Sequence, residues 1–277
     1  MPLKRDRGLL EVLLTSKSVK ISAMEYLKDV LIRTSIRRFL SRVIFLAYTN
    51  KPLSKWPKWV GEVCGINLPK RITKRKILES GGSNINIIFK LLDITQNIEG
   101  QIVECGVFQG HSLVPIGLYL KQENSQKRAY GFDSFEGFNE EVKIDIDLGG
   151  DKSSEKKIGG FDSTSCNYIQ NLIKGFKLED KIKIYQGYFE NTLSKVHEKK
   201  FSFVHLDCDL YSPYKACLEF FYPRMSQGGI ILIDEYNDPS WPGCNKAVDE
   251  FIQTNSAKLS RIEDNNYVKY YIEKGEE

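Results

Sequence analysis

The spacing of apolar and polar residues changes at about residue 100, where short apolar runs begin to alternate with stretches of helical periodicity. Apolar runs of about four to eight residues bounded by turn residues predict buried strands, and a 3.6-residue spacing of apolar positions predicts helices. The predicted strands are 101–107, 129–133, 182–187, 201–207, 229–235 and 267–272. The predicted helices are 112–122, 163–175, 213–222 and 245–255.

Nearly continuous apolar strands joined by helical crossovers indicate an α/β fold, a Rossmann-like, doubly wound and mostly parallel sheet with helices on both faces. The tyrosine-rich strand 267–272 follows a short run at 258–263, so an antiparallel edge is expected there. Segment 139–162 is rich in Gly, Lys and Asp, which predicts a long mobile loop of the kind that forms functional lids. We assign this domain to residues 81–277.

Residues 1–80 are predicted to form a basic, mainly helical N-terminal extension. They carry 18 Lys and Arg against 6 Asp and Glu, whereas the rest of the chain carries 22 against 30. Such an arm can meet anionic lipid, glycan or nucleic acid, or it can pack as a solvated helix on the body or on a second subunit. Because charge runs are weakly specific, we favour packing on the body or on a second subunit. We expect a homo-oligomer, no nucleic-acid partner and at most weak contact with a membrane surface.

The composition of the 277 residues, with 41% apolar and 27% charged, is that of a soluble globular protein. Six cysteines without a CxxC pair argue against a zinc ribbon or a disulfide framework, and favour reduced thiols in a cytoplasmic protein. No apolar run approaches the roughly 18 residues of a membrane span. The leucine-rich start resembles a signal peptide, but Glu11 interrupts its apolar core and no small-residue cleavage site follows, so no export signal is expected.

Two pairs of acids end neighbouring predicted strands. Asp207 and Asp209 follow "FSFVHL", and Asp234 and Glu235 follow "GGIILI". The carboxyl ends of parallel strands meet at one edge of a sheet, and residues two apart in an extended chain point to the same side. Carboxylates crowded there need compensation, which Mg²⁺ with its preference for oxygen ligands would supply. The alternative is that one acid caps a helix and another pairs with a lysine.

The first predicted strand ends in a glycine turn that contains Glu104, Gly106 and Gly110 and leads to Ser112 at the start of a helix. Glycines let the backbone approach a ligand, and the helix start offers free N–H groups. The GxxxG spacing differs from the dinucleotide fingerprint GxGxxG. An acid before the turn would repel a pyrophosphate and attract a cationic group. A generic strand-to-helix turn would explain the same residues.

The second predicted strand ends in "GFDSFEGF", with Asp133 followed by Ser134 and Phe135. Asp133 lies 23 residues after Gly110, close to where an acid accepts hydrogen bonds from ribose hydroxyls. A helix cap or an Asx turn is the alternative. A cationic group near Glu104 and a ribose near Asp133 together suit S-adenosylmethionine, which has a sulfonium and an amino group but no phosphate.

The three histidines add less to this picture. His205 lies within an apolar strand and is expected to be a core residue. His197, in the charged stretch "VHEKK", is expected to be solvated. His111 stands at the glycine turn and could line the cofactor pocket or simply belong to the turn.

Five ordered stretches over about 100–255 resemble the macrocin O-methyltransferase family, which includes the mycinamicin and novobiocin sugar O-methyltransferases. These stretches are "VECGVFQGHS", "GFDSFEGF", "QGYFENTL", "HLDCDLYSPYKACLEFFYPRMSQGGIILIDEY" and "WPGCNKAVDEF". The resemblance implies a class I enzyme that uses S-adenosylmethionine and Mg²⁺ to methylate a sugar hydroxyl.

The resemblance also implies residue roles. Asp207 would bind the metal with Asp234 and Glu235, and Asp209 would act as the base. The implied cofactor-binding residues are Glu104, Gly106, Gly110, Ser112, Asp133, Ser134, Phe135 and Gly187. The chain departs from the family at two positions: Cys208 stands where Gly is usual, and Glu235 where a second Asp is usual. The longer Glu arm shifts the metal.

Three other functions compete with this one. A metal-dependent phenolic or catechol-type O-methyltransferase would use similar metal chemistry. A glycosyltransferase with a DxD motif would leave the Glu104 turn and the second acid pair unexplained. A binding module tethered by the basic arm would need no acids. The acceptor is expected to be a small molecule or a glycan, in a pocket shaped by 139–162 and 238–244, where Trp241 could stack on a sugar or simply pack.

Overall fold

The computed structural model describes residues 85–139, 142–149, 159–162, 164–264 and 267–275. The predicted N-terminal extension lies outside the described residues. The boundary at residue 80, the membrane-surface contact and the homo-oligomer therefore stay predictions.

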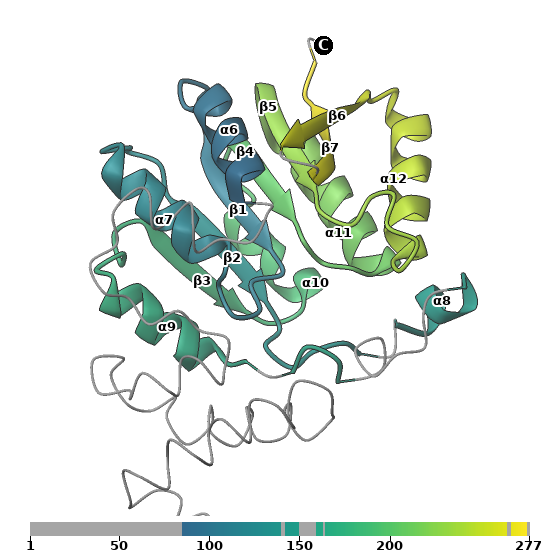
Figure 1. The fold of residues 1–277 in the computed structure, drawn as a ribbon, viewed down its shortest axis with the longest axis horizontal. Coiled ribbons are helices and arrows are strands. Elements are labelled where there is room, and N and C mark those ends of the chain that lie inside the picture. Colours follow the sequence, from purple (N-terminus) through teal and green to yellow (C-terminus); the bar gives the residue numbers. More distant parts are fainter. Residues whose placement is uncertain (1–84, 140–141, 150–158, 163, 265–266, 276–277) are drawn as a thin grey trace, which may run out of the picture.

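A seven-stranded sheet forms the centre of the domain, in the order β3-β2-β1-β4-β5-β7-β6 (Figure 1). Strands β1 to β5 pair in parallel, and β7 pairs antiparallel with both β5 and β6. The strands are β1 Gln101–Cys105, β2 Ala129–Asp133, β3 Ile182–Gln186, β4 Phe201–Leu206, β5 Met225–Ile233, β6 Leu259–Asp264 and β7 Tyr267–Glu273. The predicted doubly wound, mostly parallel α/β fold is confirmed.

Helices cover both faces of this sheet, with α6, α7 and α9 on one face and α11 and α12 on the other (Figure 1). The helices are α6 Ile85–Thr95, α7 Leu113–Gln122, α8 Val142–Asp147, α9 Cys166–Gly175, α10 Phe189–Thr192, α11 Tyr211–Phe221 and α12 Pro242–Asn255. None of the described helices has the length and apolar content that crossing a bilayer requires.

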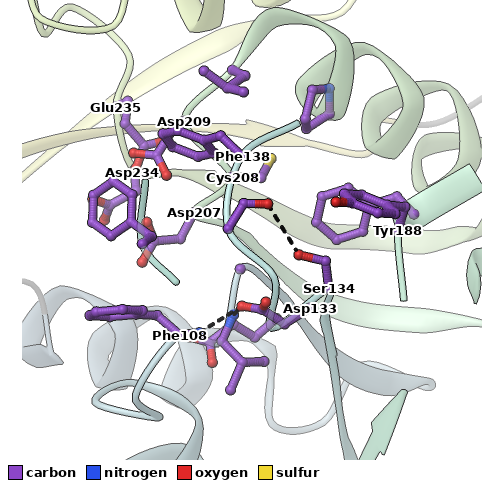
Figure 2. Close-up of a pocket in the computed structure, with 18 of the residues that line it drawn as sticks. Phe108, Asp133, Ser134, Phe138, Tyr188, Asp207, Cys208, Asp209, Asp234 and Glu235 are labelled. Carbon is purple, nitrogen blue, oxygen red and sulfur yellow. Dashed lines mark hydrogen bonds between the residues drawn. The ribbon is translucent and has the colours of Figure 1, made fainter. Parts of the chain in front are cut away.

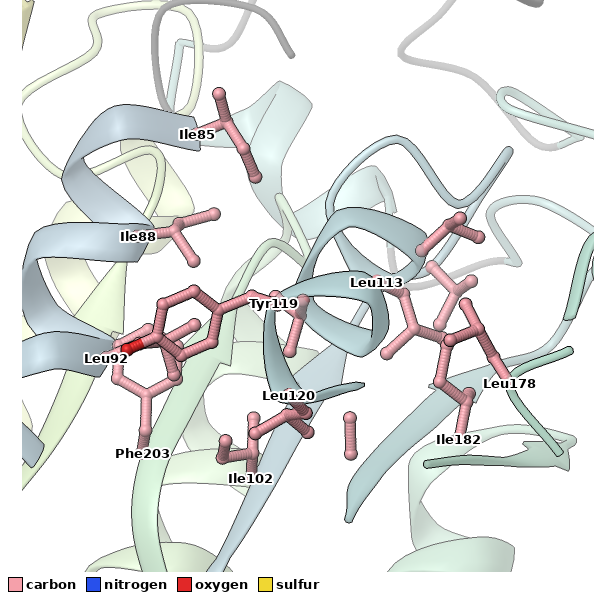
Figure 3. Packing of buried hydrophobic residues seen from close by; sticks show 14 of the residues in the cluster. Ile85, Ile88, Leu92, Ile102, Leu113, Tyr119, Leu120, Leu178, Ile182 and Phe203 are labelled. Atoms are coloured by element: carbon pink, nitrogen blue, oxygen red, sulfur yellow. The ribbon is translucent and has the colours of Figure 1, made fainter. Parts of the chain in front are cut away.

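Each face has its own apolar core. On the first face, Ile88 and Leu92 of α6 and Tyr119 of α7 pack over the sheet with Phe203 of β4, as Figure 3 shows. On the second face, the buried side of α11 and α12 packs against β4 and β5. Buried strands with cores on both faces explain the nearly continuous apolar runs.

Three features of the described chain differ from the predicted elements. Helix α6 was not predicted, although its buried residues recur with the 3.6-residue spacing of a helix. The run at 258–263 is strand β6, so β6 and not β7 is the edge of the sheet. The predicted loop 139–162 contains α8.

Candidate active site

A cavity of about 460 Å³ lies at the carboxyl ends of β1, β2, β4 and β5, on both sides of the point where the strand order reverses. Figure 2 shows Asp207, Asp209, Asp234 and Glu235 gathered on one side, with Phe108 and Asp133 on the other. Ten of the predicted site residues line it: Glu104, Gly106, Ser112, Asp133, Ser134, Gly187, Asp207, Asp209, Asp234 and Glu235. Within the described part of the chain, Gly110 and Phe135 are the two predicted site residues that do not line it. His111 lines it as well.

Glu104 places a buried carboxylate at the floor of this cavity. Its side chain is 1% exposed, and its Oε1 lies 3.1 Å from Nδ1 of His205. Its Oε2 has no hydrogen-bond partner among the described residues. Burial raises the pKa of Glu104 to about 7, although the hydrogen bond with His205 acts in the opposite direction. A carboxylate oxygen left in this state favours a cationic ligand group.

Gly106 brings the turn after β1 against the end of β4. Its φ is +90°, and a Cβ built on it would lie 1.7 Å from the backbone oxygen of Asp207. The backbones of the two strand ends therefore touch where only glycine fits. This contact sets the spacing between Glu104 and the acids of β4.

Replacing Gly106 with Ala is expected to lower the free energy of unfolding by about 3 kcal/mol or more, because the added methyl must displace the carbonyl of Asp207. Gly149→Ala is the matched control, since Gly149 also has a positive φ, +94°, but no atom of the described residues lies within 4 Å of its added Cβ. That change is expected to cost about 1 kcal/mol in urea unfolding measurements. Equal losses in the two variants would show that the close contact at Gly106 is unimportant.

Asp133 organises the turn that follows β1. Its Oδ2 accepts hydrogen bonds from the backbone N–H groups of Val107 at 2.8 Å and Phe108 at 2.7 Å, and its Oδ1 accepts one from Phe135 at 2.6 Å. Burial raises the pKa of Asp133, while these bonds lower it. Phe108 and Phe135 have φ of 45° and 57°, so the carboxylate stabilises two left-handed residues. The Asx-turn alternative is thus present, and contact with a ribose stays a prediction.

The other side of the cavity holds the acid cluster. Ligand atoms of His205, Asp207 and Asp234 all lie within 4.8 Å of one another. Nζ of Lys269, from β7, lies 2.8 Å from Oδ2 of Asp234. Burial opposes ionisation of Asp234, but the hydrogen bond from His205 and the charge of Lys269 outweigh it and lower its pKa to about 2. Burial, followed by the charge of Asp234, raises the pKa of Asp207 to about 6.

Glu235 lies beside Asp207 but is also held from behind. Its side chain is 5% exposed, its Oε2 accepts a hydrogen bond from the hydroxyl of Tyr214, and its carboxyl contacts that of Asp207. Burial, followed by the charges of Asp207, Asp209 and Asp234, raises the pKa of Glu235 well above its usual range.

This donor set fits Mg²⁺, because carboxylate oxygens that oppose each other's ionisation are what a hard divalent cation would stabilise. Asp207 and Asp234 would supply the central oxygens to such a cation, and Glu235 would add a third where it touches Asp207. His205 belongs to the same group of side chains, but its two ring nitrogens face Glu104 and Asp234.

Asp209 does not continue the strand. Strand β4 ends at Leu206, and Asp209 has φ of 62° in the turn before α11. The expectation that an extended chain places Asp207 and Asp209 on the same side is therefore wrong. Both acids nevertheless line the cavity, because the left-handed turn redirects the chain there. Cys208 between them is 6% exposed and also lines the cavity.

The whole site lies within a stretch that a single protein family accounts for. The model of that family, described as macrocin-O-methyltransferase (TylF), matches residues 87–270. The chain belongs to the macrocin O-methyltransferase family.

Curated relatives are about one quarter identical to the chain over the part that aligns. The 8-demethyl-8-(2,3-dimethoxy-alpha-L-rhamnosyl)-tetracenomycin-C 4'-O-methyltransferase of Streptomyces olivaceus is 26% identical over 166 residues, 57% of this chain and 60% of the relative. Mycinamicin III 3''-O-methyltransferase of Micromonospora griseorubida is 26% identical over 161 residues, which are 57% of this chain and 62% of the relative. The match thus spans about 60% of the length of these relatives.

Solved structures share the fold of this domain. The calicheamicin methyltransferase CalS11 superposes with a TM-score of 0.60 at 22% identity, over 84% of this chain and 92% of that one. The O-methyltransferase NovP superposes with a TM-score of 0.55 at 22% identity, over 68% of this chain and 81% of NovP. These similarities show the class I methyltransferase fold.

Four aromatic side chains pack against one another at the cavity. Phe108, Phe138, Phe161 and Trp241 are half-buried and line the cavity. The ring centroids of Phe161 lie 5.4 Å from those of Phe108 and 5.3 Å from those of Phe138, and Phe138 lies 5.9 Å from Trp241. We call these four residues the aromatic rim. Three of them were missed, although each phenylalanine stands within two residues of a glycine.

Two further residues of the site escaped prediction. His205 is buried as expected, but it connects Glu104 of the cofactor side with Asp234 of the acid cluster. Lys269 reaches Asp234 from a strand that follows it by more than thirty residues. No local sequence pattern predicts either contact, because both depend on which strands lie side by side in the sheet. His197 is exposed, as predicted.

Proposed function

We propose that this protein transfers a methyl group from S-adenosylmethionine to a hydroxyl of a glycosylated small molecule, with Mg²⁺ as its metal. The observation that carries the proposal is that two groups of acidic residues, from different pairs of strands, line one cavity. Glu104 and Asp133 line it from β1 and β2, whereas Asp207, Asp209 and Asp234 line it from the ends of β4 and β5. A cationic methyl donor suits the first side, and a metal-bound hydroxyl suits the second.

Residues of the cofactor side bind and orient the donor. The free Oε2 of Glu104 would accept a hydrogen bond from the amino group of S-adenosylmethionine. Asp133 and Ser134, which line the cavity next to Gly187, would face the ribose hydroxyls. Since the sulfonium already carries a good leaving group, the main task of these residues is alignment of the methyl carbon with the acceptor oxygen.

Residues of the acid cluster activate the acceptor. Asp207 and Asp234, with Glu235 beside Asp207, would hold Mg²⁺, which supplies Lewis-acid stabilisation of a developing alkoxide when bound. Asp209 accepts the proton that the acceptor hydroxyl loses. The oxygen then forms its bond to the methyl carbon while the carbon–sulfur bond breaks, and the electron pair stays on sulfur to give S-adenosylhomocysteine.

The aromatic rim supports a sugar as the acceptor. Half-exposed rings can pack against the C–H face of a pyranose while the acids opposite them address its hydroxyls. One of the curated relatives acts, by its name, on a tetracenomycin that carries a rhamnosyl group. A related structure, described as a TDP-rhamnose 3'-O-methyltransferase, has a TM-score of 0.53. A catechol would stack on the same rim, so it is the second candidate acceptor.

Calorimetry of the purified protein tests the donor. S-adenosylhomocysteine is expected to bind, and UDP-sugars are not, because Glu104 repels a diphosphate. Binding of a UDP-sugar without S-adenosylhomocysteine would favour the glycosyltransferase and overturn the proposal.

Binding of S-adenosylhomocysteine is expected to weaken as the pH falls below 7. The ionised form of Glu104 attracts the ligand's ammonium group, and its pKa of about 7 makes protonation compete with binding. Affinity should fall by up to about tenfold per pH unit below 7 and level off above it. Glu104→Gln is the control, expected to bind weakly with a flat profile. A constant Kd of the parent protein between about pH 5.5 and 8.5 would contradict the role of Glu104.

A further inference from the structure

Helix α8 attaches the segment between β2 and α9 to the body of the domain. Most of this six-residue helix is solvent-facing, but Val142 is 1% exposed and Asp145 is 4% exposed. Burying a carboxylate is costly unless hydrogen bonds or charge compensate it. The surroundings of Asp145 therefore need a physical explanation.

The carboxylate of Asp145 lies at the N-terminal ends of two longer helices. Its Oδ2 accepts a hydrogen bond of 3.1 Å from the backbone N–H of Tyr211, the first residue of α11. Its Oδ1 lies against Gly243, since a Cβ built on this second residue of α12 would come within 1.7 Å of it. The positive ends of helices of 11 and 14 residues stabilise such an anion.

Neither helix has a side-chain cap of its own. Leu210 and Trp241 occupy the N-cap positions of α11 and α12, and neither makes a side-chain capping hydrogen bond. Asp145 thus takes the place that Ser, Thr, Asp or Asn usually fills in the local sequence. It does so from more than sixty residues away.

The start of α11 is also the end of the turn that carries Asp209. Asp209 has a left-handed backbone, which is unfavourable for a residue with a Cβ and persists only where neighbours hold it. On the strand side, the N–H of Asp207 donates to the carbonyl of Cys105 at 2.9 Å. Within the turn, the N–H of Leu210 donates to the carbonyl of Cys208 at 2.6 Å. On the helix side, Asp145 holds Tyr211.

We infer that Asp145 is a positioning residue, which joins the starts of α11 and α12 and thereby holds Asp209 at the cavity. This role rests on the proposed function, in which Asp209 accepts the proton. Trp241 of the aromatic rim directly precedes the same start of α12. Placement of the base and of one rim residue then depends on one carboxylate.

Three variants test this role in the full-length protein. Asp145→Ala removes the carboxylate, Gly243→Ala leaves it but fills its place with a methyl group, and Asp145→Asn keeps an acceptor oxygen without the charge. Asp147→Asn is the matched control, because Asp147 lies in the same helix and is exposed. The Asp145 variants alter a small surface helix and are expected to fold.

The first two variants are expected to lower kcat by about 10- to 100-fold, since small displacements of a reacting group have effects of this size. Asp145→Asn should lose only part of that, and KM for S-adenosylmethionine should stay within about twofold, because Glu104 and Asp133 lie on other strands. Asp145→Ala combined with Gly243→Ala should be no worse than either change alone. Hydrogen exchange should quicken at the amide of Tyr211 in Asp145→Ala and not in Asp147→Asn.

An active parent protein whose Asp145→Ala variant keeps its kcat within about twofold would overturn the role of Asp145. Fully additive losses in the double variant would overturn it too, since the two residues would then act separately. A parent protein without methyl transfer would overturn the proposed function instead, and unchanged exchange at Tyr211 in Asp145→Ala would overturn the docking itself.

Discussion

Asp209→Asn is expected to lower kcat by about 100-fold or more, with S-adenosylhomocysteine and Mg²⁺ still bound within about twofold of the parent affinity. Asparagine has the size of aspartate but cannot accept the proton of the acceptor hydroxyl. It also tolerates left-handed backbone, so the φ of 62° at this position should persist. The measurements are initial rates of methyl transfer and calorimetric titration of each ligand.

Asp209→Glu is the matching variant, because it restores a base on a longer arm. It should recover part of the activity that Asp209→Asn loses. Turnover in Asp209→Asn equal to that of the parent would remove Asp209 from the proton transfer.

Asp207→Asn is expected to weaken Mg²⁺ binding by about 100-fold and to abolish most turnover, because it removes a carboxylate at the centre of the donor set. Titration with Mg²⁺, or with Mn²⁺ followed by electron paramagnetic resonance, measures the loss. Glu235→Gln should weaken the metal less, since one oxygen of Glu235 already accepts the hydrogen bond of Tyr214. If Glu235→Gln lost more affinity for Mg²⁺ than Asp207→Asn, Glu235 would be the more important metal ligand of the two.

Asp207→Asn, which weakens metal binding, is expected to stabilise the fold when no metal is bound. The pKa of Asp207 is raised to about 6 in the folded state, above its ordinary 3.8. The folded state therefore binds more protons than the unfolded state between these values, and stability falls as the pH rises through this window. Above about pH 6 the ionised Asp207 destabilises the fold. Asp207→Asn should consequently raise Tm in EDTA at neutral pH, and a lower Tm would contradict the crowding of the acids.

The fold was predictable because the pattern that specifies it is local. Strands β1, β2 and β4 are buried on both faces, so each is a nearly continuous apolar run between turn residues. The rule that ligands lie beyond the carboxyl ends of such strands then placed Glu104, Asp207 and Asp234 in one cavity. Their convergence required no knowledge of individual side-chain contacts.

The unpredicted parts depend on contacts between distant residues. Strand β6 has a partly exposed, charged sequence, and only its pairing with β7 makes it a strand. Asp145 lies in a polar segment whose sequence indicates a loop. Its role depends on a hydrogen bond with the start of α11, a helix that has no side-chain cap of its own. Asp133 was assigned to a ribose by its distance along the chain, which says nothing of the three backbone donors around it.

The central claim is a metal-dependent transfer of a methyl group to a sugar hydroxyl. Its most direct test is incubation of the protein with S-adenosylmethionine carrying a labelled methyl group and a panel of glycosides and catechols, with Mg²⁺ or with EDTA. Mass spectrometry should find the label on a sugar oxygen of at least one glycoside, only where Mg²⁺ is present. Transfer that proceeds equally well in EDTA, or that labels only catechols, would contradict the account.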